Sequence, residues 1–221
     1  KYVRVRQGIL HRKPAEIAWN AAALTEPTCV AYNALVVQSE VGPGEPLAIL
    51  GPGAIGLLCL QVAKALGASP IMITGTSVDA LRLDLARRLG ADYVVNAQEI
   101  DPVEVAMDLT HGDGIPLVID AAGNSQTIRQ SLDIVARNGQ VTKIGWGKEP
   151  VGFSLDPIVA KAVRYQGTFS HTWRTWEAVL EMTRAGRLDP AALITHQFPI
   201  GEWLTAYELV ESRQAVKVIL R

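Results

Sequence analysis

The chain has 221 residues, of which 48% are hydrophobic, and a formal net charge of -1 at pH 7. A chain of this length can bury a substantial core, so we expect a globular protein. The 21 basic and 22 acidic residues are scattered along the sequence, which argues against nucleic acid or a membrane surface as a partner.

The cysteine content and the length of the apolar runs exclude further classes of protein. Cys29 and Cys59 are too few for a disulfide framework or a structural metal cluster, and we expect both to be buried as small apolar residues. There is no signal peptide and no apolar run as long as a membrane span, which predicts a soluble, cytoplasmic protein. Because the first residue is Lys1 rather than Met, we expect an excerpt of a longer chain.

The first forty residues carry weaker signals. Residues 2–5 alternate apolar and polar side chains, which predicts a half-exposed strand with no hairpin partner nearby. Residues 15–37 have a helical composition that is interrupted at Glu26-Pro27. Since proline suits the first turn of a helix, we expect a new helix to begin there, with Glu26 at its start.

From residue 47 the chain alternates strand and helix patterns. Apolar runs predict strands over residues 47–50, 71–74, 92–96, 116–120, 140–145 and 163–169. Helical spacing predicts helices over 55–66, around Leu81, Leu85 and Leu89, over 103–109, around Ile128, Leu132 and Val135, and over a short segment before the sixth strand. This alternation predicts an α/β fold with a doubly wound parallel sheet, the Rossmann fold, and right-handed crossovers.

Beyond Ser170 the pattern changes. We expect a helix over residues 173–185, a strand over 193–198, a helix with Trp203, Ala206, Tyr207 and Val210 on one face, and a terminal strand. A nucleotide fold does not need this tail. Together with the first strand it indicates pieces of a second domain.

A glycine turn joins the first central strand to the first central helix. Its six residues, all predicted to contact a dinucleotide, are Gly51, Pro52, Gly53, Ala54, Ile55 and Gly56. In such a turn the first glycine makes the bend, the second lets a pyrophosphate approach the backbone, and the third lets helix and strand pack closely. The free amides at the helix start then face the anion.

The end of the second strand bears on cofactor choice. NAD enzymes normally place an acidic side chain there, about 20 residues past the turn, to bind the ribose hydroxyls. This chain has Gly75-Thr76-Ser77 instead. Without that carboxylate a 2′-phosphate is not repelled, and Thr76, Ser77 and Arg82 are candidate donors to it. NADP is therefore modestly favoured over NAD, although Asp79 is close enough to reach a ribose.

Four stretches, distributed from residue 21 to residue 199 and thus over most of the chain, are residues 21–27 (AAALTEP), 50–67, 85–92 (LARRLGAD) and 194–199 (ITHQFP). They resemble the zinc-type medium-chain dehydrogenase/reductase family of the alcohol dehydrogenase superfamily, in its polyol and sorbitol dehydrogenase-like branch. The resemblance implies zinc-assisted hydride transfer between an alcohol or polyol and NAD(P), and a homo-oligomer, dimer or tetramer. It also implies a division into residues 1–32, the end of a GroES-like catalytic domain, 33–168, the dinucleotide-binding domain, and 169–221, which returns to the catalytic domain.

The resemblance also assigns candidate site residues. In the polyol branch the glutamate of the Glu-Pro step lies at the zinc, which makes Glu26 the candidate metal residue; a helix-start role is equally consistent with the bare sequence. Ser170 and His171 replace an Arg-Tyr pair near the substrate of sorbitol dehydrogenases, which puts sorbitol itself in doubt. His171 is the candidate catalytic residue, with a solvent-facing loop residue as the alternative. Residues predicted to flank the nicotinamide are Ala121, Ala122, Gly123, Ile144, Gly145 and Trp146, with Ser170 also beside the cofactor.

The remaining aromatic and histidine side chains carry less information. His196 is interpreted as structural, His11 and His111 have no supporting neighbours in the sequence, and Trp173 and Trp176 suit a core or an interface.

Two other functions stay open: a zinc-free quinone or enoyl reductase, against which Glu26-Pro27 argues, and a non-catalytic dinucleotide-binding module. Since Glu26 is the one ligand that the family pattern leaves in this chain, residues 1–221 alone are predicted to be inactive, with or without zinc.

Overall fold

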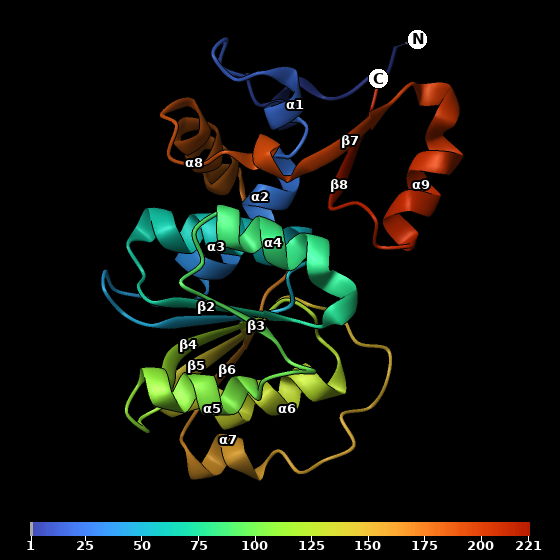
Figure 1. Cartoon of the computed structure of the whole chain (residues 1–221). Helices are drawn as coiled ribbons and strands as arrows, with labels where there is room; N and C mark the ends of the chain where they lie inside the picture. The colour runs from blue at the N-terminus through green and yellow to red at the C-terminus, as the bar shows by residue number, and fades with distance from the viewer. Residues whose placement is uncertain (1) are drawn as a thin grey trace.

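A six-stranded parallel sheet organises the computed structural model, which describes residues 2–221 (Figure 1). Its strands are β1 (Leu47–Leu50), β2 (Ile71–Gly75), β3 (Tyr93–Asn96), β4 (Ile115–Asp120), β5 (Val135–Lys143) and β6 (Arg164–Gly167). They lie in the order β3-β2-β1-β4-β5-β6, and all neighbours are parallel. The winding direction reverses between β1 and β4, which confirms the predicted doubly wound sheet.

Helices cover both faces of this sheet, as Figure 1 shows. One layer holds α3 (Ala54–Leu66) and α4 (Ala80–Arg88); the other holds α5 (Pro102–Leu109) and α6 (Ser125–Ile134), with α7 (Asp156–Ala160) outside it. Strand β1 is buried along its whole length. Leu47 and Ile49 belong to the apolar cluster of the α3 face, whereas Ala48 and Leu50 belong to that of the opposite face. A continuous apolar run is expected for a strand covered on both sides.

The two ends of the chain lie together on the α3 side of the sheet (Figure 1). The N-terminal part contains a 3-10 turn (Gln7–Ile9), α1 (Trp19–Ala22), α2 (Thr25–Tyr32) and a π-helical turn (Asn33–Val37). Residues 169–221, here called the return segment, contain α8 (Trp173–Arg184), β7 (Ile194–Phe198), α9 (Trp203–Glu211) and β8 (Lys217–Leu220). Strands β7 and β8 pair in parallel as a second, two-stranded sheet.

The side chain of Gln61 fastens the return segment to α3. Its amide nitrogen donates to the carbonyl oxygen of Asp189 at 2.8 Å, and its amide oxygen accepts from the N–H of Asp189 at 2.9 Å. Gln61 is buried, so these two hydrogen bonds satisfy an amide that would otherwise be costly inside the protein. The return segment also contributes buried side chains to the apolar cluster on the α3 face, namely Leu188, Leu193 and Val216.

Three predictions about elements need correction. Residues 2–5 are described and form no strand; Tyr2 and Val3 are exposed, and neither finds a neighbour to pair with. Val135 does not end α6 but has extended backbone angles and begins β5. Strand β5 ends at Lys143 rather than residue 145, because the chain turns there to place Gly145 against the loop that follows β4.

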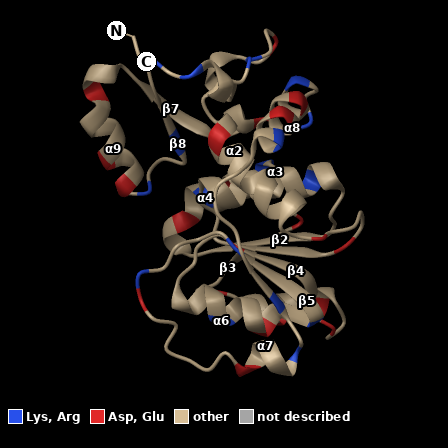
Figure 2. Ribbon diagram, turned by 180° about the vertical axis from the view of Figure 1, so that it is seen from behind, with Lys and Arg blue, Asp and Glu red and all other residues tan. Residues whose placement is uncertain are grey.

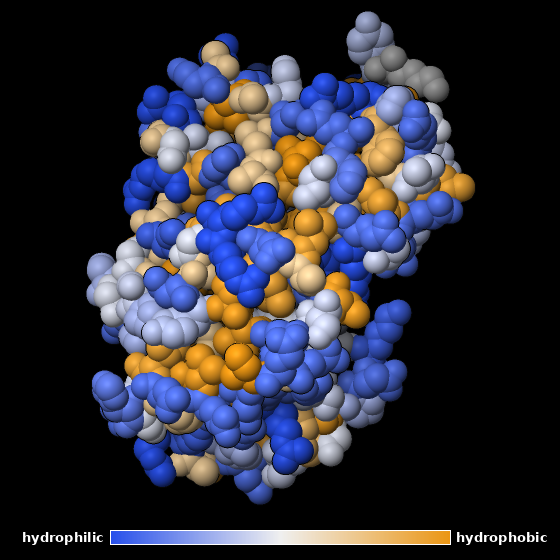
Figure 3. Space-filling view, viewed as in Figure 1, coloured by the Kyte–Doolittle hydropathy of each residue, from blue (hydrophilic) through white to orange (hydrophobic). Residues whose placement is uncertain are grey.

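Surface charge and apolarity match the composition. Lys and Arg are interspersed with Asp and Glu over the ribbon (Figure 2). Apolar patches interrupt the polar surface in Figure 3. On α9 the side chains of Trp203, Leu204 and Tyr207 are exposed. Within residues 2–221, no helix combines the length and the apolarity that a membrane crossing requires. Cys29 and Cys59 are buried, as predicted, and burial raises the pKa of each thiol to about 12.

Candidate functional site

A cleft of about 390 Å³ opens at the carboxyl edge of the sheet, where β1, β2 and β4 end. Open α/β sheets bind ligands at this edge, beside the strands where the winding reverses. The predicted cofactor residues that line the carboxyl-edge cleft are Gly51, Pro52, Gly53, Gly75, Thr76, Arg82, Ala121 and Ala122. These are eight of the seventeen predicted cofactor residues, and they come from the β1–α3 turn, the end of β2 with the segment that leads into α4 and the first turn of that helix, and the loop after β4.

Two glycines of the β1–α3 turn are required by the fold itself. Gly51 has a φ of 107°, a left-handed conformation that side chains disfavour, and a Cβ there would lie 2.9 Å from the Cβ of Ala122. A Cβ on Gly56 would overlap the carbonyl oxygen of Gly51. Gly51 thus makes the bend, and Gly56 lets α3 approach it closely.

Gly53 is different, because neither the backbone nor the packing of the protein requires a glycine there. Its φ of -65° and ψ of 177° are open to any residue. Apart from Gly53 and its two chain neighbours, no residue in 2–221 has a heavy atom within 4 Å of the position that a Cβ would take. Gly53 is also the N-cap of α3, and no side chain of the described residues caps that helix end. The turn therefore presents open space and uncapped backbone N–H groups to the cleft.

The loop after β2 is built around Asp79. The carboxylate accepts from the backbone N–H of Thr76 at 3.1 Å, from the Thr76 hydroxyl at 2.9 Å, and from Nη1 of Arg82 at 3.2 Å. Asp79 is buried and thus engaged within its own turn. Ser77 is held away from the cleft, since its N–H donates to Gln98 and its hydroxyl accepts from Asn96. Ser77 therefore does not line the cleft, whereas Thr76 and Arg82 do.

Asp120 and Lys143, the last residues of β4 and β5, hold the loops that follow these strands. Asp120 accepts from the N–H of Gly123 at 2.7 Å and from that of Ala122 at 3.2 Å. Burial raises the pKa of Asp120, and the Gly123 hydrogen bond and the charge of Lys143 oppose that rise. The Lys143 ammonium donates to the carbonyl oxygens of Gly123 and Gly145. Gly123 and Gly145 are not among the residues that line the cleft.

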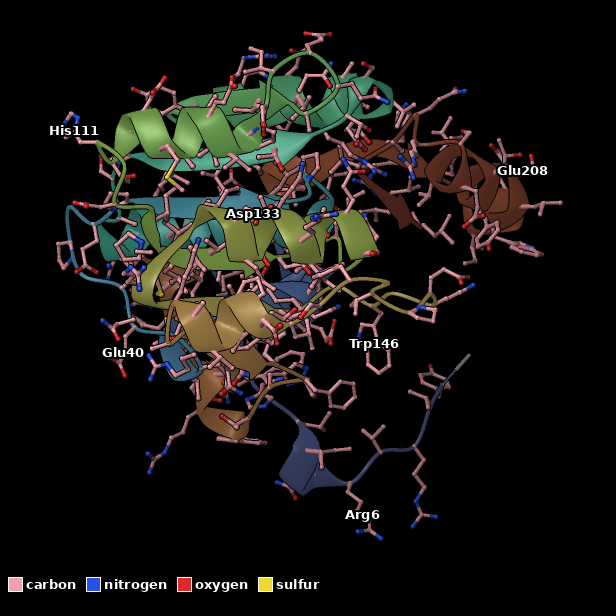
Figure 4. All side chains as sticks on the ribbon, turned by 90° about the horizontal axis from the view of Figure 1, so that it is seen from below. Arg6, Glu40, His111, Asp133, Trp146 and Glu208 are labelled. Atoms are coloured by element: carbon pink, nitrogen blue, oxygen red, sulfur yellow. The ribbon has the colours of Figure 1, made fainter. Side chains whose placement is uncertain are left out.

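Trp146 and Ile144 take opposite environments on this edge. Ile144 is buried, whereas Trp146 is 82% exposed and makes an edge contact with Phe169, with 6.2 Å between ring centroids. In Figure 4 Trp146 projects from its loop toward open space, far from His111 at the other end of the sheet. Ala54 and Ile55 lie in the first turn of α3. Ser170, exposed and with a φ of 61°, also lies outside the cleft lining.

The candidate metal and catalytic residues meet each other although 145 positions separate them. Nε2 of His171 lies 3.2 Å from Oε1 of Glu26, which is in the first turn of α2 as predicted. The indole N–H of Trp176 donates to Nδ1 of His171 at 2.9 Å. Because an indole is only a donor, Nδ1 must be the unprotonated nitrogen and the proton must sit on Nε2, facing Glu26.

His11 has neighbours that the sequence did not reveal. Nδ1 of His11 lies 2.6 Å from Oε1 of Glu177, and its ring packs on Trp173 and Trp176 at centroid distances of 3.7 and 5.0 Å. Trp173 and Trp176 thus form an aromatic cluster with His11, whereas His196 lies in β7 and stacks on Phe198. Over residues 2–221 no three His, Cys, Asp or Glu side chains converge as a metal site. Glu26 and His171 do not complete a zinc site by themselves.

Several cleft residues were missed by sequence reasoning. They are Thr74, Ala97, Asn124, Gln126, Thr127, Gln130 and Arg213. Asn124 had a detectable signal, since its side chain caps α6 by accepting from the N–H of Thr127. Arg213 had none, because the return segment brings it to the cleft from more than 130 residues past Asp79.

The glycine turn, the parallel sheet and the cleft at its carboxyl edge define an α/β protein of the Rossmann type. The family description "Zinc-binding dehydrogenase" matches residues 54–185. The chain belongs to this zinc-binding dehydrogenase family, as the resemblance predicted.

Individual relatives agree with this placement. The chain is 34% identical to a sorbitol dehydrogenase of Halalkalibacterium halodurans over 221 residues, all of this chain and 64% of that protein. It is 34% identical to an L-threonine 3-dehydrogenase of Bacillus subtilis, again over all of this chain and 63% of the relative. The alcohol dehydrogenase TADH from Thermus sp. ATN1 superposes with a TM-score of 0.88 at 29% identity, over 96% of this chain and 62% of that one. The chain therefore spans less than two thirds of these relatives.

Proposed function

We propose that this chain is the coenzyme-binding part of an NAD(P)-dependent oxidoreductase that acts on an alcohol or polyol. Gly53 is the observation that supports this most directly, because it lines the cleft and combines open space at its Cβ position with the uncapped start of α3. A pyrophosphate at this point would accept from the uncapped N–H groups of α3. The relatives are named for oxidation of hydroxyl-bearing small molecules, which supports the substrate class.

The chemistry divides between the cofactor and the chain. A nicotinamide cofactor supplies the hydride acceptor. The chain's own residues bind and orient it: the glycine turn holds the pyrophosphate, and the backbones of residues 121–123 and 144–146 flank the nicotinamide. Asp120 and Lys143 keep those two backbones in place through the hydrogen bonds described above. Titration of the protein with NADPH and NADH, followed by nicotinamide fluorescence, tests the binding; no response to either would refute the proposal.

We further propose that NADP binds more tightly than NAD. Asp79, the carboxylate of the loop after β2, is already engaged by Thr76 and Arg82. Thr76→Asp should reverse the preference, since it removes a donor and adds a carboxylate that repels a 2′-phosphate. Calorimetry with both cofactors measures the change, and Thr205→Asp on the exposed surface of α9 is the matched control. A wild-type protein that prefers NAD by about tenfold, roughly 1.4 kcal/mol, would contradict this prediction.

The contact between Glu26 and His171 supports a role for these two residues at the zinc site that the family implies. We propose that Glu26 is a contributor to the zinc site and that His171 positions its carboxylate, with the remaining ligands outside the described residues. The alternative of a zinc-free reductase gains no support from the family match. Residues 1–221 alone should therefore hold zinc weakly and show no zinc-dependent turnover of alcohols.

We also propose that the chain divides after residues 32 and 168 into two parts of a catalytic domain and the dinucleotide-binding domain between them, and that the protein is a homo-oligomer.

The histidine arrangement gives a spectroscopic prediction. At pH 8, nitrogen NMR should find His171 in the Nε2–H form, because Trp176 donates to its Nδ1. Trp176→Phe removes that donor and should yield a mixture of both tautomers. Trp203→Phe, which changes an exposed indole on α9, is the control and should leave His171 unchanged. Protonation on Nδ1 in the wild-type protein would contradict the proposed orientation.

A further inference from the structure

Arg213 stands out because it occupies a backbone position that favours glycine. It follows α9 with a φ of 61°. Its N–H donates to the carbonyl of Val210 and the N–H of Gln214 donates to that of Leu209, the pair of hydrogen bonds that closes a helix in the Schellman motif. Helices α4 and α8 end in the same motif with Gly90 and Gly186 at this point. An arginine is held here against its backbone preference.

The side chain of Arg213 reaches the carboxyl-edge cleft. Nη1 lies 3.8 Å from Oδ1 of Asp79, the oxygen that Arg82 also contacts at 3.2 Å. Two other helix ends carry non-glycine residues at positive φ, His111 and Ala162. His111 lies at the opposite end of the sheet (Figure 4) and Ala162 has no polar side-chain atoms. Arg213 is the one of these three that lines the cleft.

The charges around Asp79 do not balance. Two guanidinium groups face one carboxylate, whose other oxygen is occupied by Thr76. Arg82 is also incompletely paired, since its Nε–H has no hydrogen-bond partner among the residues that the structure describes. The side chain of Arg213 is 53% exposed and thus free to contact a ligand as well as Asp79. This corner of the cleft, beside Gly75 at the end of β2, therefore carries an excess of positive charge.

We infer that Arg213, supplied by the return segment, binds the 2′-phosphate of NADP together with Arg82. The inference rests on the proposed function, because the adenosine ribose must lie at the end of β2. Guanidinium groups suit phosphate because they donate two parallel N–H bonds to its oxygens. Cofactor preference would then be set partly by a segment outside the nucleotide fold.

The test uses the full chain and two probes, adenosine 5′-phosphate and adenosine 2′,5′-bisphosphate, which differ only in the 2′-phosphate. In calorimetry Arg213→Ala should weaken binding of the bisphosphate about tenfold, roughly 1.4 kcal/mol, and leave binding of the 5′-phosphate within about twofold. Arg87→Ala is the matched control, since Arg87 is 57% exposed and pairs with Asp84 on α4 away from the cleft. It should change neither affinity.

A second variant separates binding from structure. Arg213→Gly should lose the same affinity while the melting temperature stays level or rises by about 2–4 °C, because glycine accepts the left-handed backbone. Equal losses for both probes would place Arg213 on the shared part of the nucleotide and overturn the inference. A lower melting temperature with unchanged affinity would also overturn it, by making Arg213 a structural tether. Failure of the wild-type protein to bind either probe would instead refute the proposed function.

Discussion

A protein with valine at position 53 should keep its melting temperature and lose at least about 100-fold in dinucleotide affinity, roughly 2.8 kcal/mol. The fold should tolerate valine because no described atom occupies the space beside Gly53, and its backbone angles suit any residue. Binding should fail because the branched side chain takes the space of the pyrophosphate and covers the N–H groups of α3. Calorimetry with NADPH and a thermal melt measure the two quantities.

Gly201→Val is the control for this variant. Gly201 also has open space at its Cβ position but lies in the return segment, away from the carboxyl-edge cleft. Its substitution should leave cofactor affinity unchanged. If Gly53→Val bound the cofactor as tightly as the wild-type protein, the pyrophosphate would have to lie elsewhere, and the assignment of the glycine turn would be wrong.

Gly56→Ala should lower the free energy of unfolding by about 1–3 kcal/mol, although alanine normally stabilises a helix relative to glycine. The reason is overlap between the added methyl group and the carbonyl oxygen of Gly51, with the γ2 methyl of Ile49 also at 3.4 Å. Backbone atoms cannot rotate away as a side chain can, so α3 must shift from β1. Urea denaturation measures the loss.

This test separates two effects, because overpacking predicts that Gly56→Ala lowers the free energy of unfolding, whereas the helix propensity of alanine predicts that it raises it. Gly201→Ala adds the same methyl group in open space and should change stability by less than about 0.5 kcal/mol. A Gly56→Ala variant as stable as the wild-type protein would mean that α3 adapts easily. The third glycine would then have no packing role in this chain.

Local patterns account for the parts of the fold that the sequence predicted. Strand β1 is a run of apolar residues covered on both faces, and the glycine turn lies between that strand and a helix, so each signal falls within about twenty residues. The strand predicted over residues 2–5 was wrong for a related reason: alternation describes a strand only when a partner edge exists, and the described residues provide none near Tyr2.

The missed features depend on contacts between distant residues. Glu26 and His171 each have a separate local meaning, and only the approach of α8 to α2 places Nε2 of His171 beside the Glu26 carboxylate. The same holds for Arg213, whose position after α9 says nothing about a cleft at β2. Asp79 was recognised as close to the ribose, but its engagement by Thr76 is a matter of side-chain rotamers that no spacing reveals.

The paired hydrogen bonds of Gln61 with Asp189 also bear on cooperativity. A chain cut after residue 168 would leave the Gln61 amide without partners inside α3 and would uncover the surface that Leu188, Leu193 and Val216 pack against. The return segment and the nucleotide fold thus share one core and should melt together. In the proposed binding mode the pyrophosphate would lie at the start of α3 and the 2′-phosphate at Arg213, so these bonds would fasten together the two segments that contact the two phosphate groups.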